Sequence, residues 1–150
     1  TLLASPVPLP PHFQSVWFQL HAATAAVAYG AFAVACGAAL LQLREFAITD
    51  SQFISKAVAL GYPLLSLSII AGAIWAQLTW GAYWTWEPKE IWALVVWLLY
   101  TLFFHLKAIP RWQGRPLAFL VVVAFGAVLF TLLGTGWLAR RVTLEMMYVY

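Results

Sequence analysis

An unusual cluster of aromatic residues and two carboxylates lies in the middle of the chain. Residues 80–92 read Trp-Gly-Ala-Tyr-Trp-Thr-Trp-Glu-Pro-Lys-Glu-Ile-Trp. Because indole and phenol rings combine an apolar face with a polar edge, this segment could form a flat platform at a membrane surface for a planar apolar ligand with polar edges, such as a porphyrin. A general aromatic belt stays open as an alternative, since Trp and Tyr favour membrane interfaces.

Two histidines are candidate metal ligands. His21 follows Trp17 by one helical turn at the start of a long apolar run, and His105 lies seventeen residues after Pro88. At 1.5 Å per helical residue, roughly 25 Å separates Pro88 from His105, so His105 should not share a ligand with the aromatic segment. An ionisable residue within an apolar span is a functional candidate, and His is a common axial ligand of haem iron. Structural or interfacial roles remain the alternative, and His12 is expected to be interfacial.

The composition excludes a water-soluble globule. Of the 150 residues, 64% are hydrophobic and 9% are charged, against about 45–50% and about 25% in an ordinary soluble domain. The formal net charge of +3 is too small for a nucleic-acid-binding surface. A single cysteine, Cys36, cannot form an internal disulfide or a thiolate zinc site, and it excludes covalent haem attachment through C-x-x-C-H. The proline-rich start does not resemble a signal peptide.

The hydropathy pattern predicts an all-α integral membrane protein of about four transmembrane helices, forming a single domain over residues 1–150. A span needs roughly 20 apolar residues, and the predicted spans cover residues 16–43, 57–78, 88–107 and 117–138. Three start signals agree for the third span. Glu87 precedes a proline and should avoid helical angles, Pro88 suits the first helical position, and the Glu90 carboxylate complements the dipole of the first turn.

Two further patterns concern the surroundings of the spans. Small residues recur on the first span, which predicts close packing against other integral membrane subunits; they are Ala22, Ala26, Gly30, Ala33, Gly37 and Ala38.

The side of the membrane that holds Arg44 and Lys56 carries five Lys and Arg, whereas the opposite side carries three. Because Lys and Arg in short loops favour the cytoplasm, the aromatic loop should face a periplasm, an exterior or a lumen.

These motifs resemble the haem-handling family of cytochrome c maturation, in its CcsA or ResC branch, whose hallmark is a Trp-rich outward loop, the WWD motif. The similar segments are Ser5-Pro-Val-Pro, Gln14-Ser-Val-Trp-Phe-Gln-Leu-His, Gly61-Tyr-Pro-Leu-Leu, Ala71-Gly-Ala-Ile-Trp-Ala, residues 80–94, Trp112-Gln-Gly and Leu132-Leu-Gly-Thr-Gly. The resemblance implies that the loop presents non-covalent haem b to apocytochrome c, with a CcsB/ResB-type partner, in a bacterial inner or thylakoid-type membrane. The implied cofactor-binding residues are Trp80, Gly81, Tyr83, Trp84, Trp86, Glu87, Pro88, Glu90 and Trp92. His21 would be the first outward ligand of the haem iron, and His105 an inner ligand.

The chain departs from this family at several positions. The family has a second outward histidine shortly after the Gly-x-Gly of its last span, whereas here Trp137, Leu138 and Ala139 follow Gly136. Glu87 stands where Asp is usual, and Ile91 where Thr is usual. Two functions therefore stay open: haem binding and presentation in cytochrome c maturation, at most as a component of a haem lyase and with no catalytic residue of its own, or an accessory subunit of a respiratory or photosynthetic complex without haem ligation. A small transporter fits less well, because the spans hold no acidic pair.

Overall fold

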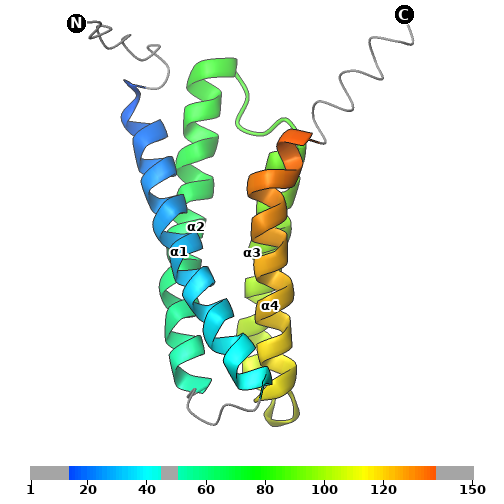
Figure 1. Cartoon of the computed structure of the whole chain (residues 1–150). Helices are drawn as coiled ribbons and strands as arrows, with labels where there is room; N and C mark the ends of the chain where they lie inside the picture. The colour runs from blue at the N-terminus through cyan, green and yellow to red at the C-terminus, as the bar shows by residue number, and fades with distance from the viewer. Residues whose placement is uncertain (1–13, 45–50, 138–150) are drawn as a thin grey trace, which may run out of the picture.

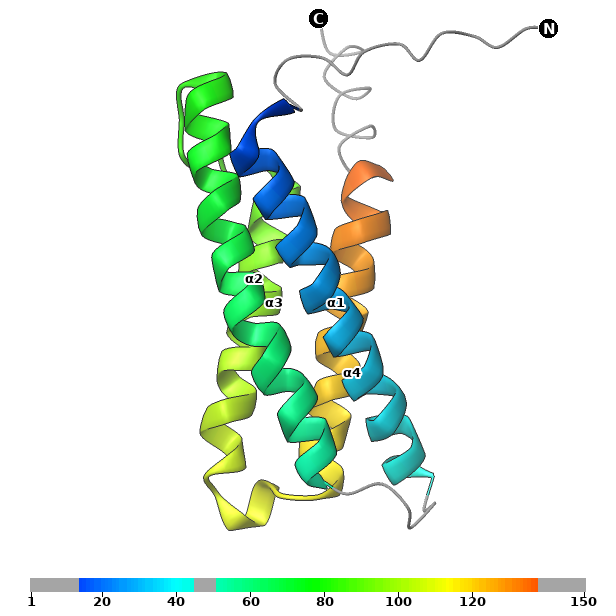
Figure 2. The ribbon, with the colours of Figure 1, turned by 90° about the vertical axis from the view of Figure 1, so that its left-hand side faces the viewer.

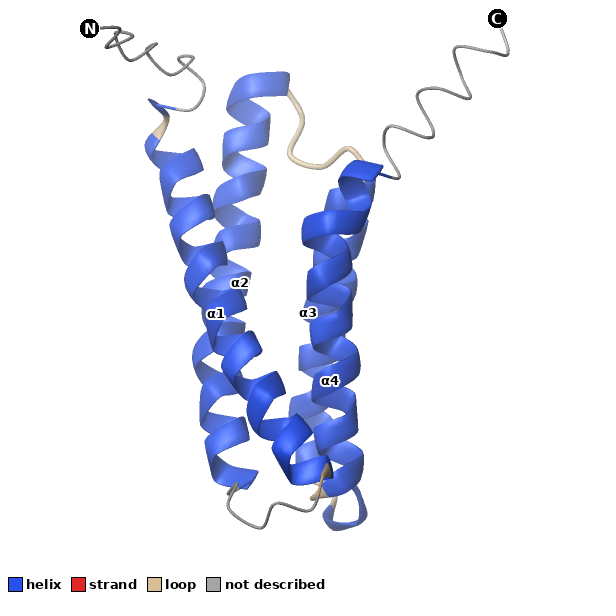
Figure 3. Cartoon of the chain, in the orientation of Figure 1, coloured by secondary structure: helices blue, strands red, loops and turns tan. Residues whose placement is uncertain are grey.

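The computed structural model describes residues 14–44 and 51–137, which are helical apart from their connections (Figure 3). In chain order the elements are α1 (Val16–Leu43), α2 (Ser51–Trp80), α3 (Pro88–Lys107), the 3₁₀ turn η2 (Pro110–Trp112), α4 (Arg115–Leu129) and the π-helical turn η3 (Phe130–Gly134). Within these ranges, four helical stretches are long and apolar enough to cross a membrane, the last running over Arg115–Trp137. The prediction of an all-α membrane protein with about four spans is confirmed.

The helices extend further than hydropathy alone suggested at two places. α2 begins at Ser51 rather than at residue 57, because its first turn exposes the polar Ser51 and Lys56 while burying Ile54 against the core. The fourth span begins at Arg115, where Gly114 has a φ of +82° and Pro116 lies in the first turn. Its predicted last residue, Leu138, lies outside the described residues.

The helices run alternately up and down, and α1 is the element that joins the two halves. The first part of α1 lies along α2, and the last part of α1 approaches α4. α3 packs on α4 (Figures 1 and 2). At the α1–α4 approach, the Arg115 guanidinium donates a hydrogen bond to the Leu43 carbonyl at 3.3 Å. The Gly81–Glu87 loop therefore lies at the same end of the bundle as the start of α1 and the end of η3, which we call the aromatic end.

Phe32 of α1 occupies the centre of the core. It is fully buried, and its ring stacks on Tyr100 of α3 with centroids 3.7 Å apart and planes 10° from parallel. Gly61 of α2 leaves room for the ring, because a Cβ there would lie 2.6 Å from Phe32 Cε1. One aromatic side chain thus fixes the spacing of three helices.

α2 and α3 contact each other less extensively than α1 and α2 do. Four hydrogen bonds form a closed ring between them, in which each residue donates to the next. The Trp97 indole donates to Ser66 Oγ at 2.9 Å, and the Ser66 hydroxyl donates to the Tyr62 carbonyl at 3.0 Å. The Tyr62 hydroxyl lies 2.8 Å from Thr101 Oγ1, whose own hydroxyl donates to the Trp97 carbonyl at 2.8 Å. Every member has a partner, as a polar group within a membrane span requires.

Five of the six small residues of α1 do not pack against the other described helices. Ala22, Ala26, Gly30, Ala33 and Gly37 are exposed, since the buried side of α1 is formed by Phe32 and its neighbours. Ala38 is different: it is 7% exposed and belongs to the core. Packing on other membrane subunits therefore stays a prediction for the five exposed residues, and it does not extend to Ala38.

Candidate functional site

The aromatic loop begins and ends on residues with left-handed backbone angles. Gly81 ends α2 with a φ of +76°, and its amide donates to the Gln77 carbonyl at 3.0 Å. Trp86 has a φ of +60°, the only positive value at a non-glycine residue in the described part of the chain. Such a conformation costs a bulky residue about 1–3 kcal/mol and is commonly found where function requires it. Trp86 is therefore held in place by its surroundings rather than by its own preference.

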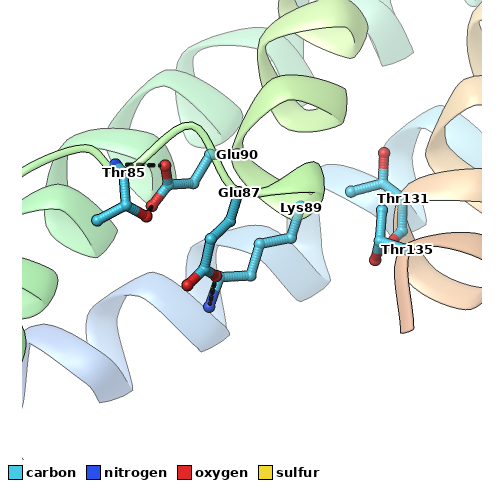
Figure 4. A network of polar contacts seen from close by, with 6 residues as sticks. All are labelled: Thr85, Glu87, Lys89, Glu90, Thr131 and Thr135. Atoms are coloured by element: carbon cyan, nitrogen blue, oxygen red, sulfur yellow. Dashed lines mark hydrogen bonds and ion pairs between the residues drawn. The ribbon is translucent and has the colours of Figure 1, made fainter. Parts of the chain in front are cut away.

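The predicted start of α3 is confirmed, and its two glutamates have different surroundings. Glu87 adopts extended angles, Pro88 occupies the first turn and Glu90 lies in that turn. The Glu90 carboxylate accepts hydrogen bonds from the Thr85 amide at 2.7 Å and from the Thr85 hydroxyl at 3.1 Å, so it ties the loop to the helix (Figure 4). Glu87 is exposed and pairs with Lys89 at 2.9 Å.

The aromatic rings of the loop do not form one flat surface. Trp84 and Trp86 meet edge to face at 84°, with ring centroids 5.8 Å apart. Trp80 packs at 80° against Trp75 of α2. This follows from the ring quadrupole, which favours edge-to-face contact over parallel faces. Trp84 and Trp86 are therefore not coplanar. Trp80, Tyr83 and Trp86 expose 61%, 61% and 67% of their surface, and a platform formed by these exposed rings stays a prediction.

The rest of the aromatic end is built around Phe130. Trp92 of α3 lies 4.3 Å, centroid to centroid, from Phe130 of η3. Gly134, at the end of this π turn, leaves room for the Phe130 ring, because a Cβ there would lie 2.6 Å from it. Thr131 and Thr135, labelled in Figure 4, donate their hydroxyls to carbonyls one turn earlier, each at 2.8 Å, which satisfies acceptors around the irregular turn.

His21 lies in the half of the bundle that carries the aromatic end and packs against Ser68 and Gly72 of α2, which precede Trp80 by twelve and eight residues. Its Nδ1 is 2.9 Å from the Ser68 carbonyl oxygen and 3.1 Å from Ser68 Oγ. The ring lies over Gly72, where a Cβ would be only 2.7 Å from Nδ1. Nε2 has no hydrogen-bond partner in the described part of the chain, so it is the nitrogen available to a ligand.

His105 lies at the opposite end of α3, roughly 25 Å from Pro88 along the helix. Its Nδ1 is 2.8 Å from the Thr101 carbonyl oxygen, and the side chain is exposed. We call this the basic end, because it holds Arg44, Lys56, Lys107, Arg111 and Arg115. The two histidines thus share one arrangement, Nδ1 on a backbone carbonyl, but cannot hold the same ligand. His12 lies outside the described residues.

The arrangement suits a metal that brings most of its own ligands. Among residues 14–44 and 51–137, no group of three or more His, Cys, Asp or Glu side chains could hold a bare metal ion. A porphyrin iron needs only one or two axial ligands from the protein. The half of the bundle that carries the aromatic end supplies a histidine nitrogen and exposed rings, and the buried Trp84 indole N–H has no acceptor in the described chain. A histidine nitrogen and exposed aromatic rings are the kinds of group that an axially ligated porphyrin uses.

Ser68 and Gly72 were not predicted as part of the site. In the sequence they are a small polar residue and a glycine within an apolar run, which are ordinary in membrane helices. Only the pairing of α1 with α2 brings both to His21. Thr85 was likewise missed, although its place five residues before Glu90 at a helix start is a usable signal.

Comparison with known proteins identifies a matching family and several relatives of this chain. The cytochrome c assembly protein family matches residues 2–142. The chain is 44% identical over 100 residues to the cytochrome c biogenesis protein CcsA of Thermosynechococcus vestitus, covering 67% of this chain and 31% of that protein. It is 46% identical over 85 residues to CcsA of Synechococcus elongatus (57% and 26%), and 39% identical over 108 residues to CcsA of Gloeobacter violaceus (72% and 32%). The matched region thus spans about a third or less of these relatives.

Proposed function

The chain belongs to the cytochrome c assembly protein family, and we propose that it binds non-covalent haem b and presents it during cytochrome c maturation. The observation that carries this proposal is the placement of His21: an imidazole whose Nε2 is available lies in the same half of the bundle as three exposed aromatic rings. The haem would supply an iron that takes an axial nitrogen and vinyl groups that react with thiols, and the thiols would come from apocytochrome c.

The roles of the chain's own residues follow from their positions. His21 would bind the iron through Nε2, while Trp80, Tyr83 and Trp86 would cover the apolar porphyrin surface. Glu90 would hold the loop in shape through Thr85. No acid, base or nucleophile is assigned, so the chain would contribute binding and orientation to a haem lyase or synthase rather than its chemistry.

His105 would bind haem at a separate, inner position. Its Nδ1 is engaged by the Thr101 carbonyl, and the neighbouring cations of the basic end suit the carboxylates of a porphyrin. By the same charge asymmetry, the basic end would face the cytoplasm and the aromatic end the periplasm, exterior or lumen of a bacterial inner or thylakoid-type membrane.

Further membrane helices are expected around this chain. The CcsA relatives are longer than the region that matches, and the exposed small residues of α1 would admit another helix closely. We propose that a CcsB/ResB-type protein or other integral subunits complete the assembly. An accessory subunit without haem ligation is the second candidate, favoured because Trp137, Leu138 and Ala139 follow Gly136 at the place where the family has a histidine.

The test is the haem content of the protein purified gently with its membrane partners. Pyridine haemochrome assays would compare the wild type with His21→Ala and with Gln19→Ala, an exposed neighbour on α1. We expect His21→Ala to lose haem from the aromatic end and Gln19→Ala to retain it. His105→Ala and Leu102→Ala, an exposed neighbour on α3, are the corresponding inner pair. Equal haem content in all four variants, or no haem in the intact assembly, would overturn the proposal in favour of the accessory subunit.

A further inference from the structure

We infer that Ser68 and Gly72 of α2 are positioning residues for His21, which fix both the tautomer and the orientation of its imidazole. This inference rests on the proposed haem-binding function and deepens it. α2 holds no candidate ligand of the iron itself. Its role would be to determine which imidazole nitrogen reaches the iron.

The hydrogen bonds around Ser68 determine where the imidazole proton lies. The Ser68 carbonyl oxygen has no proton to give, so a distance of 2.9 Å to His21 Nδ1 requires Nδ1–H to be the donor. The Ser68 hydroxyl donates to the His21 carbonyl at 3.0 Å, which leaves Oγ as a second acceptor 3.1 Å from Nδ1. In the neutral ring the lone pair is therefore on Nε2.

Burial makes this assignment robust. Ser68 is 2% exposed, so water does not compete for its oxygens. The opposite tautomer would place the Nδ1 lone pair 2.9 Å from the carbonyl oxygen, where the two lone pairs repel each other, and only the Ser68 hydroxyl could then donate to Nδ1. These contacts favour the tautomer that carries its proton on Nδ1.

Gly72 fixes the ring in space. A Cβ at this position would lie 2.7 Å from Nδ1 and 3.1 Å from Cε1 of His21, so the imidazole lies directly on the α2 backbone. A methyl group at residue 72 would displace the ring from α2 and separate Nδ1 from Ser68. Side chains that orient a metal-binding histidine typically change metal affinity by 10–100-fold when they are altered.

One measurement tests the tautomer without haem. Histidine-selective ¹⁵N NMR of the haem-free protein in lipid, with His21 assigned by the loss of its signals in His21→Ala, should show a protonated Nδ1 and an unprotonated Nε2. The Gly72→Ala variant should lose this preference. A protonated Nε2 in the wild type would overturn the inference whether or not the protein binds haem.

A second measurement tests the consequence for haem. In the assembly with its partners, we expect Gly72→Ala to weaken haem binding by 10–100-fold and to shift the electron paramagnetic resonance signal of the ferric iron. Ser68→Ala should act in the same direction but less strongly, because it removes Oγ and keeps the carbonyl that accepts from Nδ1. Gly126→Ala is the matched control for Gly72, because a Cβ there meets nothing within 4 Å and the residue is exposed on α4, away from the small-residue face of α1. Circular dichroism and thermal unfolding of each variant establish that it folds, and Ser68→Ala remains as a test if Gly72→Ala does not.

The outcomes separate the two proposals. If His21→Ala abolishes haem binding but Ser68→Ala and Gly72→Ala keep the wild-type affinity and spectrum, the positioning role is refuted while the haem-binding function stands. If His21→Ala has no effect on haem content, the proposed function fails, and the NMR result alone decides whether α2 fixes the ring.

Discussion

The Thr85 amide donates a 2.7 Å hydrogen bond to Glu90 Oε2, and the Thr85 hydroxyl donates to the other carboxylate oxygen at 3.1 Å. One carboxylate in the first turn of α3 therefore holds the last residues of the aromatic loop. The loop conformation thus depends on a side chain of the helix that follows it.

Removing this carboxylate should loosen the loop without unfolding the bundle. In Glu90→Ala we expect the free energy of local opening at Thr85 to fall by about 1–3 kcal/mol, because a charged acceptor of two hydrogen bonds is lost. Hydrogen exchange of the loop amides measures this. Glu87→Ala is the control, since it removes only an exposed ion pair with Lys89 worth about 0–1 kcal/mol. Equal exchange in the two variants would contradict the role of Glu90.

Trp86 should show opposite effects on stability and on ligand binding. Its φ of +60° is strained for Trp but easy for glycine, so Trp86→Gly should leave the free energy of unfolding unchanged or raise it by about 1 kcal/mol. The same substitution removes an exposed ring, and haem content should fall. Tyr83→Gly is the comparison: it also removes an exposed ring, but no positive φ is relieved. A larger stability loss for Trp86→Gly than for Tyr83→Gly in detergent would refute the strain argument.

Much of this fold was accessible from sequence, for physical reasons that do not extend to the site. In lipid every span must satisfy its own backbone, so apolar runs predicted the helices, and Pro88 predicted where α3 begins. The pairing of α1 with α2 has no comparable signal, because any apolar helix can face any other. Ser68 therefore could not be assigned to His21 in advance, and the edge-to-face geometry of Trp84 and Trp86 depended on the loop's backbone angles.

The hydrogen bond between Tyr62 and Thr101 should couple α2 to α3 measurably. We expect a double-mutant cycle of Tyr62→Phe and Thr101→Val to give a coupling free energy of about 0.6 kcal/mol and at most about 1.7 kcal/mol, the range of interhelical hydrogen bonds in membranes. Unfolding in mixed micelles provides the free energies. The Tyr62→Phe variant paired with Thr79→Val, whose hydroxyl bonds only within α2, should show no coupling. A zero value for the first cycle would mean that the hydrogen bond between Tyr62 and Thr101 adds nothing to the contact between the two helices.

Gly61 should be far less tolerant of a methyl group than Gly37. At Gly61 a Cβ would lie 2.6 Å from Phe32 Cε1 and 3.1 Å from the Ala28 carbonyl oxygen, a backbone atom of α1. The Phe32 ring cannot retreat, because Tyr100 stacks on its face 3.7 Å away. We therefore expect Gly61→Ala to lower the free energy of unfolding by about 1–3 kcal/mol.

Two comparisons show whether the Phe32 ring is the cause. Gly37→Ala should cost little or nothing, since a Cβ there meets no atom within 4 Å. In a Phe32→Ala background the added methyl group at residue 61 should cost less than in the wild type, because the ring that it would strike is gone, although the Ala28 carbonyl still limits the approach. If Gly61→Ala costs as much without the ring as with it, the constraint lies in the backbones of α1 and α2, and Phe32 does not set the spacing of these helices.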